Sequence, residues 1–155
     1  MKLLMPVSAT RPPLSPARLR YMADRVVRRV KGSAFASRAE ASLIFVGAAR
    51  MRTLNRKYRR QDRPTDVLSF PLMEGCRFPA PPRGPRVLGD VVLCTPVATR
   101  QARENGIPVS EEVARLFVHG LLHLLGYDHA VPAQEKKMFA LQERFLGRRE
   151  GGRRK

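Results

Sequence analysis

Residues 119–129 read His-Gly-Leu-Leu-His-Leu-Leu-Gly-Tyr-Asp-His and hold all three histidines of the 155-residue chain. His119 and His123 are four residues apart, so on a helix they lie one turn above the other on the same face. Gly126 suits the left-handed end of that helix, after which the chain reverses and His129 can return to the same point. Three imidazoles that converge in this way predict a metal site on a helix and the following loop.

The chemistry of such a site follows from its ligand number. Three imidazoles leave the fourth position of tetrahedral Zn²⁺ open, which is typical of catalytic rather than structural sites. Water bound there has its pKa lowered toward about 7 and supplies hydroxide at neutral pH. We therefore expect one Zn²⁺ per chain, held by His119, His123 and His129. Imidazole ligands also suit other transition metals such as Ni²⁺, copper and iron.

The same spacing of histidines occurs in the metzincin proteases. In those enzymes the residue directly after the first histidine is Glu, the general base that activates water for attack on the peptide. Here Gly120 stands in that position. Peptide hydrolysis is therefore disfavoured, although a zinc metalloprotease that recruits its base from elsewhere stays open as an alternative.

Outward from the motif, the chain alternates between strand and helix patterns. Ser110, followed by two acidic residues, is expected to cap the helix that carries the histidines. Strands are expected over residues 41–46, 66–70 and 87–94, and helices over 15–32, from 48 to an end before Pro64, 95–105, 110–126 and 133–146. Residues 74–86 are rich in Pro, Gly and Arg and indicate a loop. The order predicts one α+β domain over 1–150, with a short mixed sheet of about four strands and about five helices, before a disordered basic tail over 151–155.

The charge is large and unevenly placed. The chain has 30 Lys and Arg against 13 Asp and Glu, a net charge of +17, and residues 1–60 hold 15 of the basic side chains but only two acidic ones. A one-sided basic surface favours a polyanionic partner such as a nucleic acid. Codon bias is the simpler alternative, since 24 of the 30 basic residues are Arg, but it explains the excess of Arg over Lys better than the shortage of acidic residues. A membrane surface and acidic protein substrates are lesser alternatives.

The cysteines and the apolar segments indicate a cellular location. Cys76 and Cys94 have neither metal-ligand nor redox spacing, so we expect two reduced thiols. The apolar run near Met1 is too short for a signal peptide, and no apolar stretch approaches the length of a membrane span. These features together predict a protein of the cytoplasm with no membrane partner.

The 119–129 motif resembles that of the YbeY family of bacterial rRNA-maturation endoribonucleases, H-G-x-L-H-L-x-G-Y-D-H. Two further blocks are similar to that family: Asn-Arg-Lys-Tyr-Arg at 55–59 with Pro-Thr-Asp-Val-Leu-Ser-Phe-Pro at 64–71, and Leu-Gly-Asp-Val-Val-Leu at 88–93. The similarity extends over about residues 40–146. It implies a small α+β fold, zinc on the three histidines, and cleavage of single-stranded RNA. It also implies 16S rRNA processing and quality control of the small ribosomal subunit.

The resemblance also implies site residues and partners. Arg59 corresponds by position to the family's functionally important arginine, and we expect it to hold the scissile phosphate while His119 serves as the second catalytic residue. Ser69 and Asp90 are candidates for substrate contact, although a strand hydroxyl or carboxylate equally suits a structural role. No residue stands out as the general base. Expected partners are single-stranded RNA, 16S rRNA, the small ribosomal subunit, a small-subunit ribosomal protein and a ribosome-assembly GTPase. A non-catalytic RNA-binding assembly factor is the third possibility.

Overall fold

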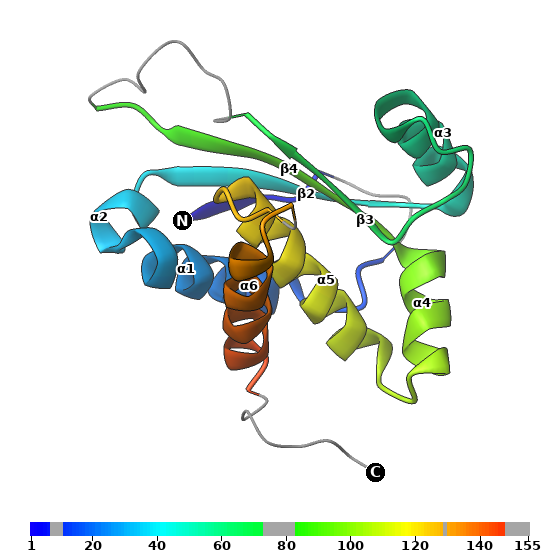
Figure 1. Cartoon of the computed structure of the whole chain (residues 1–155). Coiled ribbons are helices and arrows are strands. Elements are labelled where there is room, and N and C mark those ends of the chain that lie inside the picture. The colour runs from blue at the N-terminus through cyan, green and yellow to red at the C-terminus, as the bar shows by residue number, and fades with distance from the viewer. Residues whose placement is uncertain (7–10, 73–82, 129, 148–155) are drawn as a thin grey trace.

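A four-stranded mixed sheet forms the middle of the molecule, as the computed structural model shows (Figure 1). The strands are β1 (Lys2–Leu4), β2 (Ala39–Val46), β3 (Val67–Pro71) and β4 (Arg86–Cys94), in the order β1-β2-β4-β3. β1 and β4 each pair with β2 in parallel, and the edge strand β3 pairs antiparallel with β4. The structure describes residues 1–6, 11–72, 83–128 and 130–147. His129, most of the expected loop over 74–86 and the expected tail over 151–155 lie outside the described residues.

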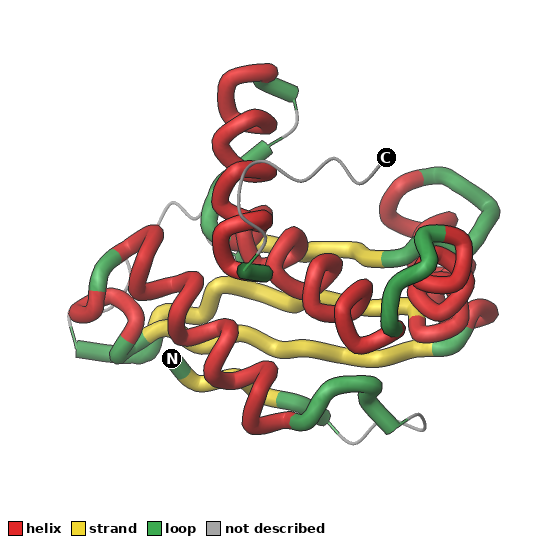
Figure 2. The backbone as a smooth tube through the Cα atoms, turned by 90° about the horizontal axis from the view of Figure 1, so that it is seen from below, coloured by secondary structure: helices red, strands yellow, loops and turns green. Residues whose placement is uncertain are grey.

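Helices cover the two faces of the sheet unequally. They are α1 (Pro16–Lys31), α2 (Ser33–Ala36), α3 (Ala48–Arg59), α4 (Thr95–Glu104), α5 (Val109–Leu124) and α6 (Pro132–Phe145). Seen from below, α1 and α5 lie across one face of the sheet, and α6 packs beside α5 (Figure 2). On the other face α3 covers only the end near the start of β3 (Figure 1). The larger part of the core therefore lies between the sheet and α1, α5 and α6.

The alternation of side chains along β2 explains why the described residues form two hydrophobic clusters, one on each face of the sheet. On β2, Ala41, Leu43 and Phe45 are buried and belong to the large cluster with α1 and α5. Alternate residues of a strand point to opposite faces. Ile44 therefore belongs to a second, smaller cluster, built around Met51 of α3. That cluster joins α3 to the sheet.

The predicted α+β fold with a mixed four-stranded sheet is confirmed, with two differences in detail. The described residues hold six helices rather than five, because the four-residue α2 follows Gly32. The prediction that Ser110 caps the histidine helix is wrong. Pro108 holds the extended N-cap position, and its carbonyl oxygen accepts from the amides of Glu111 and Glu112 at 3.0 and 3.2 Å.

Candidate functional site

The histidine pair lies on α5, the most apolar helix of the fold. The sheet side of α5 is buried through residues such as Phe117 and Leu121, whereas His119 and His123 are half-buried on another face of the helix. Gln142, which is 2% exposed, comes to His119 from the neighbouring helix α6. The core therefore fixes the backbone of α5, and α6 fixes the first of the two imidazoles.

The ring nitrogens of the pair face each other. Nε2 of His119 lies 3.2 Å from Nε2 of His123, with ring centroids 4.8 Å apart and ring planes at 71°. Nδ1 of His119 lies 3.1 Å from Oε1 of Gln142. An amide oxygen only accepts, so Nδ1 carries the proton and donates to it, which leaves the lone pair of Nε2 directed at His123.

This geometry suits two ligands of one cation. Zinc–nitrogen bonds of about 2.0–2.1 Å in a tetrahedral site place two ligand nitrogens about 3.3 Å apart, close to the 3.2 Å separation of the pair. A second-shell acceptor such as Gln142 is the usual partner for the other nitrogen of a ligating histidine. The same separation also allows Nε2–H of His123 to donate to His119, so metal binding at that nitrogen would require the His123 proton to lie on Nδ1 instead.

The predicted third ligand is not among the described residues. Within those parts of the chain, no group of three His, Cys, Asp or Glu side chains is placed to hold a metal ion. His129, the predicted third ligand, lies outside them. The three-histidine site and the identity of its ion therefore stay predictions, and the structure contributes the arrangement of His119, His123 and Gln142.

Gly120 lies on the side of α5 that approaches the sheet most closely. A Cβ atom added there would lie 2.7 Å from Cγ1 of Val91, 3.1 Å from Oγ of Ser69 and 3.3 Å from Cγ2 of Val67. The Ser69 hydroxyl donates to the carbonyl oxygen of Gly120 at 3.1 Å. A glutamate has no room at this position, where the metzincins carry their general base. Ser69 is thereby placed in the contact between helix and sheet.

Arg59 and Asp90 lie toward the opposite face of the sheet. Arg59 is the last residue of α3 and is exposed. Asp90 precedes Val91, whose side chain meets α5, so strand alternation directs Asp90 toward the face that carries α3. The structure thus brings His119, His123 and Ser69 together on one side of the sheet and places Arg59 and Asp90 on the other.

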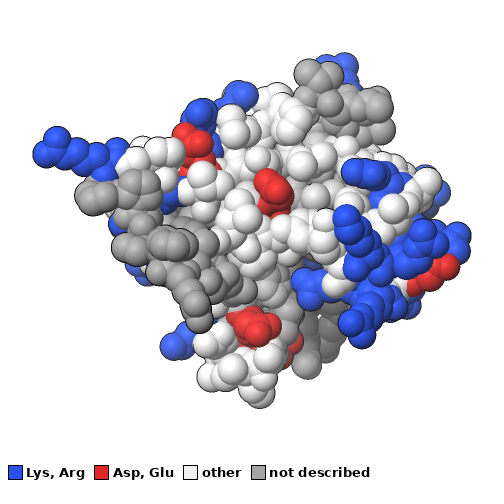
Figure 3. Space-filling model, turned by 90° about the horizontal axis from the view of Figure 1, so that it is seen from above, with Lys and Arg blue, Asp and Glu red and all other residues white. Residues whose placement is uncertain are grey.

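Basic side chains gather over α3. Figure 3 shows Lys and Arg concentrated at the end of this face where α3 lies, while the middle of the face is mainly uncharged. Tyr58 stands among them, 53% exposed, with its ring centroid 4.9 Å from that of Phe70 on β3. We refer to this set of exposed residues as the α3 basic surface: Arg50, Arg52, Arg56, Lys57, Tyr58, Arg59 and Arg60.

A family model described as Endoribonuclease YbeY matches residues 8–150. The chain belongs to the YbeY family. Proteins named Endoribonuclease YbeY from Rhodococcus opacus and Mycobacterium tuberculosis are each 49% identical to it over 111 residues, 70% of this chain. The matched segment covers 62% and 63% of those two proteins, so it spans less than two thirds of the length of these curated relatives.

A solved structure shares the fold of this chain. The solution structure of TM1509 from Thermotoga maritima matches with a TM-score of 0.63 at 28% identity, covering 95% of this chain and 87% of that one. The resemblance to the YbeY family seen in the 119–129 motif is therefore confirmed. Among the described residues, no helix is both long enough and apolar enough to cross a membrane.

One buried neighbour of the histidine pair is absent from the residues that the sequence pattern singles out. Gln142 was not singled out, yet it is the buried partner of His119. A signal was present, because Gln142 follows Met138 by four residues and so shares its helix face. A polar residue on the buried face of an amphipathic helix points to a partner across the helix interface.

Proposed function

We propose that this chain is a metal-dependent endoribonuclease that cleaves single-stranded RNA. The observation that carries the proposal is the pair of Nε2 atoms of His119 and His123, 3.2 Å apart, with the first imidazole held by Gln142. The names of the matching relatives support an endoribonuclease. A net charge of +17 supports a polyanionic substrate.

Each part of the chain has a distinct role in this proposal. His119 and His123, with His129, would hold Zn²⁺, which when bound would activate water near neutral pH, polarise a phosphoryl oxygen, or do both. Gln142 keeps the lone pair of His119 directed at the ion. Arg59 binds a phosphate of the RNA through its planar guanidinium, and the rest of the α3 basic surface holds the neighbouring backbone.

The two faces of the sheet set the path of the substrate. The histidines lie on the α5 side, and Arg59 lies at the end of α3 on the other side, with the edge strand β3 between them. An RNA strand that contacts both would therefore pass around an edge of the sheet, and β3 is the edge strand that contacts both α5 and Tyr58 of α3. Single-stranded RNA is flexible enough to make this bend, which supports it over a duplex as the substrate.

The biological setting follows from the family resemblance. It supports action in 16S rRNA maturation and in quality control of the small ribosomal subunit, in the cytoplasm. A small-subunit ribosomal protein and a ribosome-assembly GTPase are the further partners we propose. Ni²⁺ or another transition metal could take the place of Zn²⁺ on imidazole ligands.

The test compares wild type with His119→Ala and His123→Ala, using the exposed α6 variant Lys137→Ala as the control. We expect about one transition-metal ion per chain in wild type and Lys137→Ala, and loss of the ion in both histidine variants. Cleavage of end-labelled single-stranded RNA should fall at least 100-fold in the histidine variants, with unchanged circular dichroism. RNA cleavage by metal-free protein would refute the mechanism.

A parallel assay on casein separates the alternatives. Proteolysis without RNA cleavage would favour the metalloprotease, and RNA binding with neither activity would favour a non-catalytic assembly factor. For the arginine, Arg59→Glu is compared with Arg56→Glu, which makes the same charge change one turn earlier on α3. We expect Arg59→Glu to lower RNA cleavage at least tenfold more than Arg56→Glu, with metal content unchanged. Equal losses of RNA cleavage in the two variants would mean that Arg59 contributes only its positive charge.

A further inference from the structure

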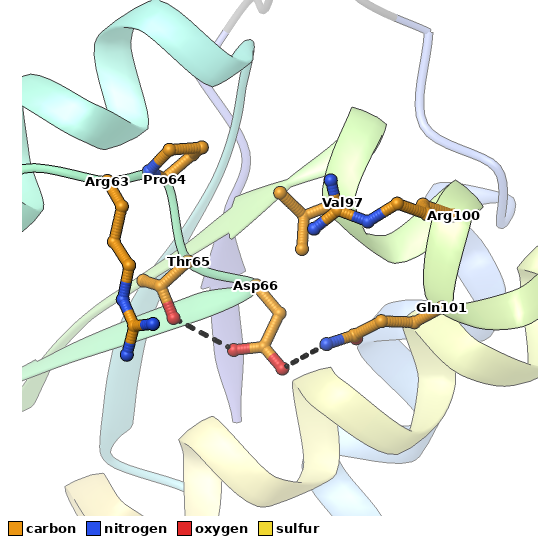
Figure 4. A pocket seen from close by; sticks show the side chains of 7 residues that line it. All are labelled: Arg63, Pro64, Thr65, Asp66, Val97, Arg100 and Gln101. Carbon is orange, nitrogen blue, oxygen red and sulfur yellow. Dashed lines mark hydrogen bonds between the residues drawn. The ribbon is translucent and has the colours of Figure 1, made fainter. Parts of the chain in front are cut away.

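A separate recess lies between the loop that leads into β3 and the first turns of α4 (Figure 4). Its volume is about 340 Å³, near the lower end of the roughly 300–1,000 Å³ typical of small-molecule sites. Arg63 and Arg100 stand on opposite sides of Asp66, and Gln101 lies beside that carboxylate. The recess therefore combines two cations with a group of hydrogen-bond acceptors.

Asp66 is fixed by three donors. Its Oδ1 accepts from the amide of Val67 at 2.7 Å and from the hydroxyl of Thr65 at 3.3 Å, and its Oδ2 accepts from Nε2 of Gln101 at 3.0 Å. A carboxylate offers about four acceptor sites. With three donors among the described residues, one site stays open on Asp66 for a donor from a ligand.

Gln101 adds a second acceptor. Because its Nε2 donates to Asp66, its Oε1 is turned away from that carboxylate. This oxygen is buried and has no hydrogen-bond partner among the described residues. Buried polar atoms are nearly always paired in folded proteins. A small turn of the Gln101 side chain would expose this oxygen to the recess, where an N–H group of a ligand held by Asp66 would satisfy it.

The two arginines have only long contacts within the described residues. Arg63 reaches Oε1 of Gln61 at 3.5 Å, and Arg100 reaches Glu104 at 3.9 Å with 64% of its side chain exposed. Surface contacts of this length are weak, so both guanidinium groups can turn to bind an anion such as phosphate. Val97 adds an apolar wall against which a flat ring can pack.

We propose that this recess binds one guanosine nucleotide of an RNA strand. The phosphate lies on Arg63 and Arg100, and the N1–H and N2–H₂ edge of guanine donates to Asp66 and Gln101. Guanine is favoured because it presents two adjacent donor groups on one edge, whereas adenine, cytosine and uracil each present a single donor group there. The recess thus selects a base by hydrogen bonds to its Watson–Crick edge, as single-strand readers do.

The position of the recess links it to the histidine site, and this link rests on the proposed function. Asp66 precedes Ser69 by three residues, about 10 Å along the strand direction. Ser69 contacts the backbone of α5 beside His119. The bound guanosine would therefore lie within a few nucleotides of the cleaved phosphate. A fixed guanine near the cleavage position is the expected sequence preference.

The test is direct binding by the full chain, without added metal. Titration with GMP, AMP, CMP, UMP and inorganic phosphate, followed by calorimetry or NMR shifts, should show GMP binding at least tenfold more tightly than CMP or UMP. Arg100→Ala and Gln101→Met should each weaken GMP binding at least fivefold. Arg103→Ala, an exposed residue of the same helix outside the recess, is the matched control and should leave binding unchanged.

Three results would overturn the proposal: equal binding of all four nucleotides, phosphate bound as tightly as GMP, or equal losses in Arg100→Ala and Arg103→Ala. Arg100 is exposed, so its variant keeps the test valid even if Gln101→Met does not fold. The proposed function fails separately, since it is measured by RNA cleavage. Selective GMP binding without RNA cleavage would support the guanosine site and refute the proposed function. RNA cleavage without selective GMP binding would refute only the guanosine site.

Discussion

Gly120→Ala tests how closely α5 approaches the sheet. The added Cβ would lie 2.7 Å from Cγ1 of Val91 and 3.1 Å from Oγ of Ser69. Ordinary carbon–carbon contacts are about 3.5–4.0 Å, so α5 or Val91 must move by about 1 Å. Val91 is fully buried and β-branched, which restricts rotation of its side chain away from the helix.

The size of the effect follows from two opposing contributions. Overpacking of this kind costs about 1–3 kcal/mol, and replacing Gly by Ala inside a helix returns about 1 kcal/mol. We therefore expect Gly120→Ala to lower the free energy of unfolding by up to about 2 kcal/mol, measured by urea denaturation with circular dichroism. In a Val91→Ala background the nearest obstacle is removed, so the same substitution should be neutral or stabilising by up to about 1 kcal/mol. The difference between backgrounds is the coupling energy, about 1–3 kcal/mol.

Two results would contradict this reasoning. Stabilisation of the otherwise wild-type protein by about 1 kcal/mol would mean that Gly120 is an open helical position, since that is the gain expected from helix propensity alone. An equal loss of stability in both backgrounds would mean that Val91 is not the obstacle. A loss of stability caused by the methyl group alone would also exclude the larger glutamate, and hence a metzincin-type base, from this position.

Three further predictions concern the site and its surroundings. Gln142→Met should lower zinc affinity about 10–100-fold in a chelator competition, whereas Lys137→Met on the exposed side of α6 should not, and equal affinities would deny Gln142 a role in positioning its histidine. Ser69→Ala removes a hydrogen bond to the α5 backbone and should lower the free energy of unfolding by about 1 kcal/mol in urea denaturation; no change would mean that the bond is not stabilising. Burial raises the pKa of the Cys94 thiol, so less of the reactive thiolate forms at a given pH. In a Cys76→Ser variant, iodoacetamide at pH 8 should therefore label Cys94 at least tenfold more slowly in the folded protein than in urea, and equal rates would contradict its burial.

Elements that rest on local pattern were predictable, and those that rest on distant pairing were not. The expected strands over 41–46, 66–70 and 87–94 lie within two residues of β2, β3 and β4 at each end. β1 was missed because it has three residues and only Leu3 is buried. Its partners on β2 lie 38 residues further along the chain, so its extended form depends on tertiary contacts.

Contacts within the candidate site also separate into those predictable from local spacing and those that depend on tertiary packing. The juxtaposition of His119 and His123 follows from helix geometry alone, so the spacing predicts it. The contact between His119 and Gln142 joins two helices across 23 residues and depends on how α6 packs against α5. The relation of Arg59 to the histidines depends on which face of the sheet each helix covers. Sequence pattern says which side of a helix is apolar, but it does not say which face of a mixed sheet that helix meets.

The central place of α5 in the core affects how the protein folds during translation. The buried side chains of Leu43 and Phe45 on β2 share their cluster with α5, which ends at Leu124. Chains grow by about 5–20 residues per second, so roughly 4–16 s separate the synthesis of these two elements. Throughout this interval the apolar side of β2 lacks the helix that completes its cover. A nascent chain of this kind stays exposed to aggregation for seconds, which makes it a natural client for chaperones that bind during translation.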